Sequence, residues 1–455
     1  MEFKSWQNTF MLPCFGSADF EACVVKEVGV DIETIKQRLL NDKDREEDST
    51  INIARHEPNS VGFNFVDTKD FSKNYYTQFS GDNFLTEWFI YMFKLAHKCV
   101  KNMKQNEPMA MTEEDERNFR NAKCCHICQK EYQKGDVKVR DHDHVTGKFR
   151  GSAHEVCNLN YYPKRFFPVI IHNLRNYDSH FLIRSAFEIS KALNFKCNFQ
   201  GIPLNSEKFM CISVGCLKLI DSFQFMSSSL EKLTDNLIDK DSEDRYRHFH
   251  NMRREFPEHM ELLCKKGHYP YSWVDSVEKL KFRGLPPREA FDNDLSGDKV
   301  SDDQWEHVKK VYETFKIDYF EEYHNIYLKT DVVLLADIFQ RFREVSYNDY
   351  GLDPLNYVSV PGLAWDAMLK MTGIRLELIT DPKILNMLER HKRGGLCFVG
   401  SKRHAKANNR ELPDYDDGKP SSFIQYYDVN NLYGHAMVQP LHFRGFRLDE
   451  IEEGR

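Results

Sequence analysis

A cysteine- and histidine-rich stretch in the first half of the chain most constrains how this sequence can fold. Cys125 and Cys128 flank two residues, and His154 and Cys157 repeat that spacing farther along. Two such pairs on two short elements can hold one zinc ion tetrahedrally, because thiolates and imidazoles are ligands that zinc prefers. The spacing therefore predicts a zinc site formed by these four side chains.

The same stretch carries polar side chains that a purely structural zinc knuckle does not need. They are Asp141, His142, His144 and Asn158. Acids, amides and imidazoles beside a zinc knuckle suggest nuclease chemistry, in which a histidine activates water and a metal ion holds the scissile phosphate. The alternative is a knuckle that only stabilises the fold or binds DNA. Cys124 and His126 stay open as alternative zinc ligands.

These residues resemble the recombination endonuclease VII family, which is part of the wider HNH group. The resemblance implies that Asp141 and Asn158 hold a magnesium ion and that His142 is the general base. Arg150 would support the phosphate. His154 stands where the family often has cysteine, which conserves a zinc ligand. Whether this cassette cuts DNA or only binds it stays open.

The composition limits the remaining possibilities. A chain of 455 residues can hold about two to four domains, at roughly 100–200 residues each. The formal net charge is -7, so binding of nucleic acid must come from local basic patches. Scattered cysteines and the lack of a signal peptide indicate a reduced, intracellular protein. No apolar run approaches the roughly 18 residues of a membrane span.

Periodicity predicts the main elements of secondary structure. Strands are expected at 13–25, 167–171, 217–221 and 423–428, and helices at 84–103, after Thr112, at 327–343 and at 363–372. The first strand places Asp19 and Glu21 on one face, because side chains alternate along a strand. The long helix places Tyr327 and Asp331 one turn apart on one face. Residues 235–315 are strongly charged and are expected to form a peripheral insertion or a helical subdomain.

Three short motifs are weak evidence separately and strong evidence together. In chain order they are Asp19-x-Glu21, Asn173-x3-Tyr177-Asp178 and Tyr327-x3-Asp331. Two-metal phosphodiester hydrolysis needs about four carboxylates around ions that lie about 3.5–4 Å apart. These motifs supply four carboxylates, and the tyrosine one helical turn before the last of them can orient the attacking water.

The set resembles the exonuclease motifs of the proofreading domain of family B DNA polymerases, in particular the protein-primed, organellar and viral branch. Further motifs that support the resemblance are Ser229-Leu230, Arg393-Gly394-Gly395 and residues 428–434. The first resembles the motif that holds single-stranded DNA in the exonuclease channel. The second resembles the Y-x-G-G motif between exonuclease and polymerase, with arginine in place of tyrosine. The third resembles polymerase motif A, with asparagine and glycine replacing serine and proline.

The resemblance implies roles for two residues of motif A. Asp428 would bind the catalytic magnesium, and Tyr433 would be the steric gate that excludes ribonucleotides. An Asp-Thr-Asp turn and the lysine motif that contacts the incoming triphosphate do not occur in the sequence. We therefore expect the chain to be the amino-terminal part of a polymerase, which does not extend a primer alone.

A basic run lies between the exonuclease and motif A. Residues 390–410 contain seven Lys or Arg, among them Lys402 and Arg403, and no Asp or Glu. Two glycines within the run permit a close approach of the backbone to a phosphate chain, and the positive charge would bind it. A solvated surface is the alternative, but we expect a contact with the template.

The predicted fold is mixed α/β, with an RNase-H-like 3′–5′ exonuclease core whose mixed sheet is flanked by helices. The expected domains are 1–122 and 163–345 for the exonuclease, 123–162 for an inserted ββα-metal zinc cassette, and 346–455 for a linker and the start of a polymerase palm. The predicted function is that of a protein-primed, family B DNA-directed DNA polymerase.

The resemblance also implies cofactors and partners. Magnesium or manganese would serve the exonuclease, and zinc the cassette. The partners would be DNA as a single-stranded 3′ end or template-primer, deoxynucleotides in the full-length protein, and a terminal priming protein, with no membrane. The site of action would be the nucleus, a viral or mobile-element replication site, or the mitochondrion. The alternatives are a structure-selective endonuclease run by the cassette and a non-catalytic, DNA-binding remnant of a mobile element.

Overall fold

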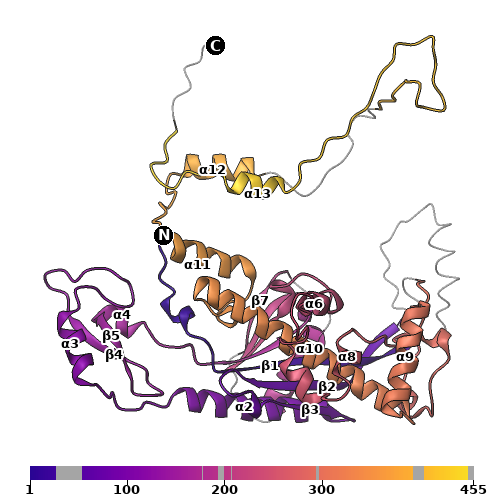
Figure 1. Ribbon diagram of the computed structural model, residues 1–455, viewed down its shortest axis with the longest axis horizontal. Coiled ribbons are helices and arrows are strands. Elements are labelled where there is room, and N and C mark those ends of the chain that lie inside the picture. Colours follow the sequence, from indigo (N-terminus) through magenta and orange to yellow (C-terminus); the bar gives the residue numbers. More distant parts are fainter. Residues whose placement is uncertain are drawn as a thin grey trace. The chain divides into compact units, whose positions relative to one another are not determined.

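The computed structural model describes residues 1–26, 54–176, 178–192, 199–205, 208–293, 297–392 and 404–448 (Figure 1). The chain forms two compact units. The larger is Lys4–Met368, and the smaller combines Met1–Phe3 with Leu369–Arg455. Among the described helices, none has the length and apolar character needed to cross a bilayer.

A seven-stranded mixed sheet is the centre of the larger unit. Its strands are β1 (Cys14–Lys26), β2 (Ala54–Asp67), β3 (Tyr75–Ser80), β6 (Phe167–Ile171), β7 (Phe199–Pro203), β8 (Phe209–Val214) and β9 (Leu217–Asp221), in the order β3-β2-β1-β6-β9-β8-β7. β1, β6 and β9 are parallel, and the other neighbours pair antiparallel. The predicted mixed sheet is therefore confirmed, as are three of the four predicted strands.

The helices of the larger unit confirm most of the helices that were predicted from the periodicity of the sequence. They are α2 (Phe84–Met103), α3 (Glu113–Asn121), α4 (Glu155–Leu159), α5 (Asp178–Ala192), α6 (Leu230–Leu237), α7 (His250–Glu255), α8 (Met260–Leu263), α9 (Asp302–Phe315) and α10 (Phe320–Tyr350). α11 (Val360–Thr372) follows them. α3 begins at the predicted cap, since Thr112 and Asp115 form a reciprocal capping box.

The two faces of β1 are covered by different helices. Ala18 and Phe20 enter the apolar core together with α2, where the Phe20 ring meets Trp88 edge-on at 5.3 Å. The intervening side chains face the opposite way, because side chains alternate along a strand, and α10 packs against β1 (Figure 1). There the Ser17 hydroxyl donates to the Val332 carbonyl over 2.8 Å. α10 therefore crosses the face of the sheet that carries Asp19.

Gly62 on β2 permits the close approach of α10. A Cβ at this position would lie 2.9 Å from Val332 and 3.1 Å from Leu328. Only a strand without a side chain here can lie so near the helix. The contact brings the middle of α10 over the centre of the sheet, where the sequence predicts the active-site carboxylates.

The charged segment 235–315 is not wholly peripheral, so that expectation is wrong for its middle. Residues 265–272 cross the α10 face of the sheet, and Val24 donates its N–H to the Val274 carbonyl over 2.9 Å. A buried polar anchor holds the segment in place. Asp337 on α10 accepts from the backbone N–H and the side-chain amide of Asn251 at the start of α7.

The zinc cassette lies between α2 and β6 in the chain. It contains a two-stranded antiparallel sheet, β4 (Lys138–His142) and β5 (Phe149–His154), which leads directly into α4. The order strand, strand, helix is the predicted ββα arrangement. Trp6 and Tyr161 pack against its small core around Cys125.

The smaller unit contains α12 (Pro382–His391) and α13 (Leu432–Met437). The strand predicted at 423–428 is wrong, because these residues are exposed and have no strand partner among the described residues. An isolated bridge between Asn408 and Ser422 ends just before them. A strand needs hydrogen-bond partners, and periodicity alone cannot supply them.

Candidate functional site

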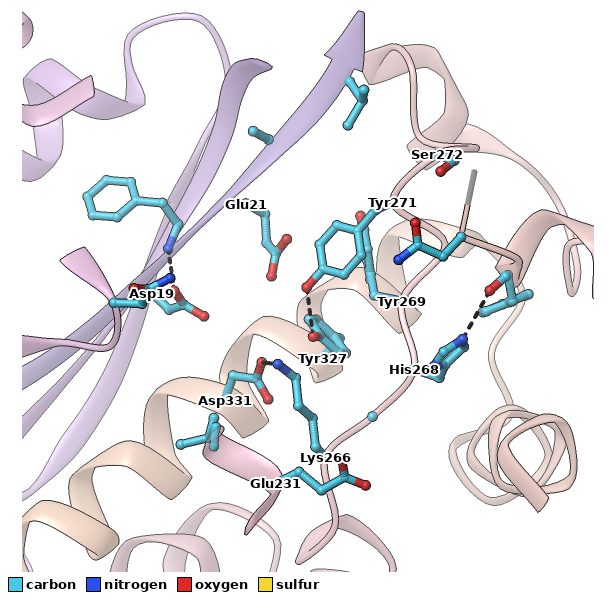
Figure 2. Close-up of a pocket in the computed structure, with 18 of the residues that line it drawn as sticks. Asp19, Glu21, Glu231, Lys266, His268, Tyr269, Tyr271, Ser272, Tyr327 and Asp331 are labelled. Atoms are coloured by element: carbon cyan, nitrogen blue, oxygen red, sulfur yellow. Dashed lines mark hydrogen bonds and ion pairs between the residues drawn. The ribbon is translucent and has the colours of Figure 1, made fainter. Parts of the chain in front are cut away.

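A cavity of about 570 Å³ brings together residues from segments that are far apart in the sequence. Of the eight residues predicted for the exonuclease or its DNA channel, seven line it, and Ser229 does not. The seven are Asp19, Glu21, Asn173, Asp178, Leu230, Tyr327 and Asp331. Figure 2 shows β1 and α10 presenting their acids and tyrosine toward one hollow. The predicted convergence of the four carboxylates is therefore present in the structure.

The carboxylates interact electrostatically. Burial raises the pKa of Asp19 to about 7, and the charge of Asp331 adds to the effect. Burial and the charge of Asp19 raise the pKa of Glu21 well above its usual range. Burial and Asp19 do the same for Asp178. Four acids with this mutual repulsion need cationic partners to be ionised together at neutral pH.

Two carboxylate oxygens point to a bound cation. Asp178 Oδ1 and Asp331 Oδ1 are buried, and neither has a hydrogen-bond partner among the described residues. A buried carboxylate oxygen without a hydrogen-bond partner costs free energy of folding. Coordination of a divalent cation such as Mg²⁺ or Mn²⁺ would remove that cost. The donor set therefore fits a magnesium or manganese site.

A pair of tyrosines lies beside the carboxylates. The hydroxyls of Tyr271 and Tyr327 are 2.9 Å apart (Figure 2). Burial, and after it the charge of Asp331, raises the pKa of Tyr327 well above its usual range. Burial and Glu21 raise the pKa of Tyr271 in the same way. Both phenols therefore stay protonated at neutral pH, and they act as hydrogen-bonding groups rather than as bases.

The sequence reasoning missed a cation in this site. Lys266 lies in the loop after α8, and its Nζ is 3.9 Å from Asp331 Oδ2 (Figure 2). The Asp331 charge raises the pKa of Lys266 and thereby outweighs burial. The run Lys265-Lys266-Gly267-His268-Tyr269-Pro270-Tyr271 alternates basic and aromatic residues. That pattern is typical of nucleic-acid binding and could have identified this wall of the cavity.

Asn173 begins the loop that leads to Asp178, and its backbone lies in the left-handed region. Asn173 has φ +61, and its side-chain oxygen accepts from the Asn176 amide over 2.5 Å. Tyr177 lies outside the described residues. Ser229 caps α6, since its hydroxyl accepts from the Lys232 N–H over 3.3 Å. That cap orients Leu230 into the cavity.

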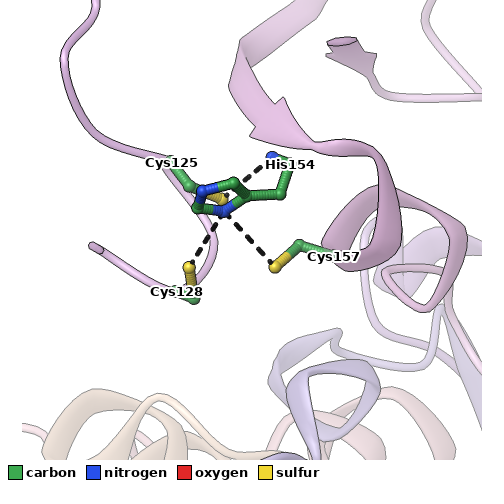
Figure 3. A group of neighbouring side chains, drawn as sticks. All are labelled: Cys125, Cys128, His154 and Cys157. Atoms are coloured by element: carbon green, nitrogen blue, oxygen red, sulfur yellow. Dashed lines mark hydrogen bonds between the residues drawn. The ribbon is translucent and has the colours of Figure 1, made fainter. Parts of the chain in front are cut away.

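The four predicted zinc ligands form one cluster. The ligand atoms of Cys125, Cys128, His154 and Cys157 all lie within 4.8 Å of one another (Figure 3). Nδ1 of the histidine faces the sulfurs, 3.4 Å from Cys128 and 3.8 Å from Cys157. Three cysteines and one histidine at such distances fit a structural zinc ion. Cys124 is outside the cluster, and so is His126.

Two thiols of the cluster have pKa values that are shifted in opposite directions. Burial would raise the pKa of Cys125, but N–H groups of Cys128 and His154 stabilise the thiolate and lower the pKa to about 7. In the same cluster burial and Cys128 raise the pKa of Cys157 to about 12. Three thiolates cannot ionise together in so small a volume without a cation. A bound zinc ion would instead lower the pKa of Cys157.

Asp141 is buried and forms an ion pair with Arg150. Both carboxylate oxygens accept from Arg150, each over 2.8 Å. His126 Nε2 lies 3.0 Å from Oδ2 without forming a well-directed hydrogen bond. Each oxygen keeps lone-pair capacity beyond this hydrogen bond, so the role of Asp141 as a magnesium ligand stays a prediction. The sequence did not indicate that a neighbour of the zinc ligands contacts this acid.

The remaining cassette residues lie close by. His142 ends β4, and its ring stacks on His144 with centroids 4.6 Å apart. Asn158 is on α4 and is partly exposed. Their roles as base and magnesium ligand stay predictions.

The residues predicted for polymerisation lie in the smaller unit or outside the described structure. Asp428 is exposed, and Tyr433 in α13 is 78% exposed. Arg393, Gly394, Gly395, Lys402 and Arg403 lie outside the described residues. The predicted template contact of the basic run is therefore not tested.

Comparison with known proteins agrees with this arrangement. Residues 155–446 match the family model of DNA polymerase type B, organellar and viral. Residues 100–165 match that of recombination endonuclease VII, and this match begins before the predicted cassette boundary. Neither the curated proteins nor the solved structures give a match. With well over half of its length matched, the chain belongs to the organellar and viral type B DNA polymerases and carries an inserted endonuclease VII domain.

Proposed function

We propose that the larger unit is a metal-dependent 3′–5′ exonuclease that removes nucleotides from single-stranded DNA ends. The observation that carries the proposal is the cavity where Asp19, Glu21, Asp178 and Asp331 meet. They come from β1, the start of α5 and the middle of α10, and two of them have a buried oxygen without a partner in the part of the chain that the structure describes. No purely structural purpose is served by four mutually repelling acids in one cavity.

Different residues of the cavity would contribute to different parts of the hydrolysis reaction. Bound Mg²⁺ or Mn²⁺ would polarise the phosphate and lower the pKa of an attacking water. The protonated hydroxyl of Tyr327 is placed to orient that water, and Tyr271 fixes the hydroxyl by sharing a hydrogen bond with it. The Lys266 ammonium offsets negative charge that develops at the phosphate.

The cavity walls suit a single strand. Leu230 offers an apolar surface against which a base can pack. Lys265 and His307 lie on the same wall and can accompany the backbone. A duplex end would have to be unpaired before its 3′ nucleotide reached the carboxylates.

The test is degradation of single-stranded DNA by the full chain. The DNA is labelled at the 5′ end so that shortening from the 3′ end gives a ladder of products. Asp19→Ala and Asp331→Ala should each lower the rate by at least about 100-fold, because a loss of about 3 kcal/mol of transition-state stabilisation costs two powers of ten. Asp349→Asn is the matched control, since Asp349 is on α10 and outside the cavity. Equal rates in all three variants would refute the proposal.

A second candidate function is cleavage of branched DNA by the cassette. The match to recombination endonuclease VII favours it, together with the zinc cluster and the ββα order. The ion pair of Asp141 with Arg150 weighs against it. His142→Ala should abolish cutting of branched DNA if the cassette is active, while Asp19→Ala should not. Binding without any cleavage would favour a DNA-binding remnant.

We propose DNA synthesis for the smaller unit only because the chain belongs to a family of DNA polymerases. Asp428 would hold a magnesium ion, and Tyr433 would exclude ribonucleotides. A terminal protein would prime the synthesis, and template-primer and deoxynucleotides would be the substrates. Templated incorporation by the 455-residue chain would contradict our expectation that it does not polymerise alone.

A further inference from the structure

A buried chain of hydrogen bonds runs behind the exonuclease cavity. The Ser60 hydroxyl donates to Asn59 Oδ1 over 2.8 Å, so its oxygen is free to accept. His324 Nε2 lies 2.8 Å from that oxygen, and His324 Nδ1 lies 2.7 Å from the Tyr269 hydroxyl. Ser60 is on β2, opposite Glu21 on β1, and His324 is on α10. Three separate segments are linked in this way.

The Ser60 proton is already used in the hydrogen bond to Asn59, and this determines the tautomer of His324. Because Ser60 Oγ accepts, Nε2 carries the proton and Nδ1 accepts from Tyr269. Burial lowers the pKa of His324 to about 4, so the ring stays neutral at physiological pH. Among the described residues, the partners of the two ring nitrogens are the hydroxyls of Ser60 and Tyr269, and burial raises the pKa of Tyr269 well above its usual range, so that its phenol stays protonated. The neutral imidazole therefore donates one hydrogen bond to Ser60 and accepts one from Tyr269.

Tyr269 transmits this connection to the site. Its ring lies 4.9 Å from the ring of Tyr327 and 5.0 Å from the ring of Tyr271. Those are the two tyrosines whose hydroxyls meet beside the carboxylates. A shift of Tyr269 therefore displaces both. Figure 2 shows Tyr269 behind this pair, on the side away from Asp19.

Other contacts hold the same loop at its start. Gly267 passes so close to Tyr327 that a Cβ there would lie 2.9 Å from its ring. The Tyr323 hydroxyl donates to the His268 carbonyl over 2.5 Å. These contacts seat the backbone of the loop on α10, and Tyr269 adds a side chain that lies against both rings of the tyrosine pair.

We propose that His324 is a positioning residue of the exonuclease, which holds Tyr269 through its hydroxyl and thereby fixes the Tyr271–Tyr327 pair over the carboxylates. The inference rests on the proposed exonuclease function and deepens it. His324 does not touch the reacting atoms, so it acts on the geometry of the site rather than on proton transfer.

The activity test uses Tyr269→Phe, which removes only the hydroxyl, and His324→Gln. Each should lower kcat on single-stranded DNA by roughly 10- to 100-fold, with KM changed much less, because small displacements of reacting groups have such effects. The double variant should be no slower than the slower single variant. Tyr312→Phe is the matched control, because the Tyr312 hydroxyl is buried near the loop and has no partner among the described residues. An additive double variant, or a kcat equal to that of the control, would overturn the inference.

A second readout separates this inference from the proposed function. Hydrogen exchange of a peptide covering residues 266–272 should become faster in His324→Gln and Tyr269→Phe, and should not change in Tyr312→Phe. Unchanged exchange would overturn the positioning role even if the protein degrades DNA. Inactive wild-type protein with faster exchange in the two variants would refute the exonuclease but not the hydrogen-bond chain.

The pH profile gives a third readout. The neutral His324 contributes no titration between pH 5 and 8, so the profile of kcat should keep its shape in His324→Gln while its height falls. Loss of a step near pH 6 in the variant would show that His324 transfers protons, and the positioning role would be wrong.

Discussion

Lys266 Nζ lies 3.9 Å from Asp331 Oδ2, although the lysine and the aspartate are 65 positions apart in the chain. The lysine is on the loop that closes the cavity, and the aspartate is on the helix that crosses the sheet. Burial raises the pKa values of Asp19, Glu21 and Asp331, and the positive charge of Lys266 partly offsets this effect. The segment expected to be peripheral therefore supplies a cation to the site.

Removing this cation should slow hydrolysis strongly. We expect Lys266→Met to lower kcat on single-stranded DNA by about 100-fold, because a preorganised charge at the phosphate is lost. Lys266→Arg should retain part of the activity. The control is Lys309→Met, which removes an ion pair with Glu306 on the outside of α9. A Lys266→Met enzyme as fast as this control would show that the lysine is only structural.

The buried acids should make the metal-free protein less stable as pH rises. Asp19 is protonated in the folded state up to about pH 7, and in the unfolded chain it ionises near its usual pKa. Between these values the folded state binds more protons, so the free energy of unfolding falls as pH rises through this range. Each unit of pKa difference corresponds to about 1.4 kcal/mol. Asp19→Asn should flatten the dependence.

Urea unfolding in EDTA between pH 4 and 8 measures this effect. Asp337 has a pKa raised by burial to about 7 and contributes a slope of the same sign, so the comparison is between Asp19→Asn and wild type. Added Mg²⁺ should stabilise the protein most at the alkaline end, where the acids are ionised. Identical pH dependence in the two proteins would contradict the assignment.

The parts of the site that the sequence predicted are those that local periodicity encodes. Alternation in β1 places Asp19 and Glu21 together, and a spacing of four in α10 places Tyr327 and Asp331 together. Both rules depend only on neighbouring residues. The prediction that the two elements converge rested on the order of the motifs and on the resemblance to a known family.

The parts that the sequence did not predict depend on distant partners. The loop with Lys266 reaches the sheet because Asp337 anchors Asn251, and no local pattern indicates that contact. His126 lies beside Asp141 because Gly151 leaves room for its ring, which a Cβ would approach to 2.7 Å. The strand expected at 423–428 failed for the same reason, since alternation does not provide a neighbouring strand.

A fully buried ion pair joins the start of the chain to the end of α10. Arg343 donates to Asp353 through two hydrogen bonds of 2.9 and 2.7 Å and also to the Leu12 carbonyl. Arg343→Met should cost about 3–5 kcal/mol of unfolding free energy, because it leaves a buried charge unpaired. Combining it with Asp353→Asn should restore part of the loss. Arg341→Met, which breaks a partly exposed pair with Glu344, should cost less than about 1 kcal/mol.

The zinc cluster gives a last prediction, which concerns a residue outside the ligand set. Asp136 Oδ2 lies 3.3 Å from Nε2 of His154, the ring nitrogen that faces away from the sulfurs. A carboxylate in this place orients the ring and makes the other nitrogen a better ligand, so Asp136→Asn should weaken zinc binding by about 10- to 100-fold. Competition with a chromophoric chelator measures the affinity, and Glu113→Gln on the exposed side of α3 is the control. Because the exonuclease carboxylates lie on other elements, degradation of single-stranded DNA should not change in Asp136→Asn. Equal zinc affinity in the two variants would show that the ring is held by its two strands alone.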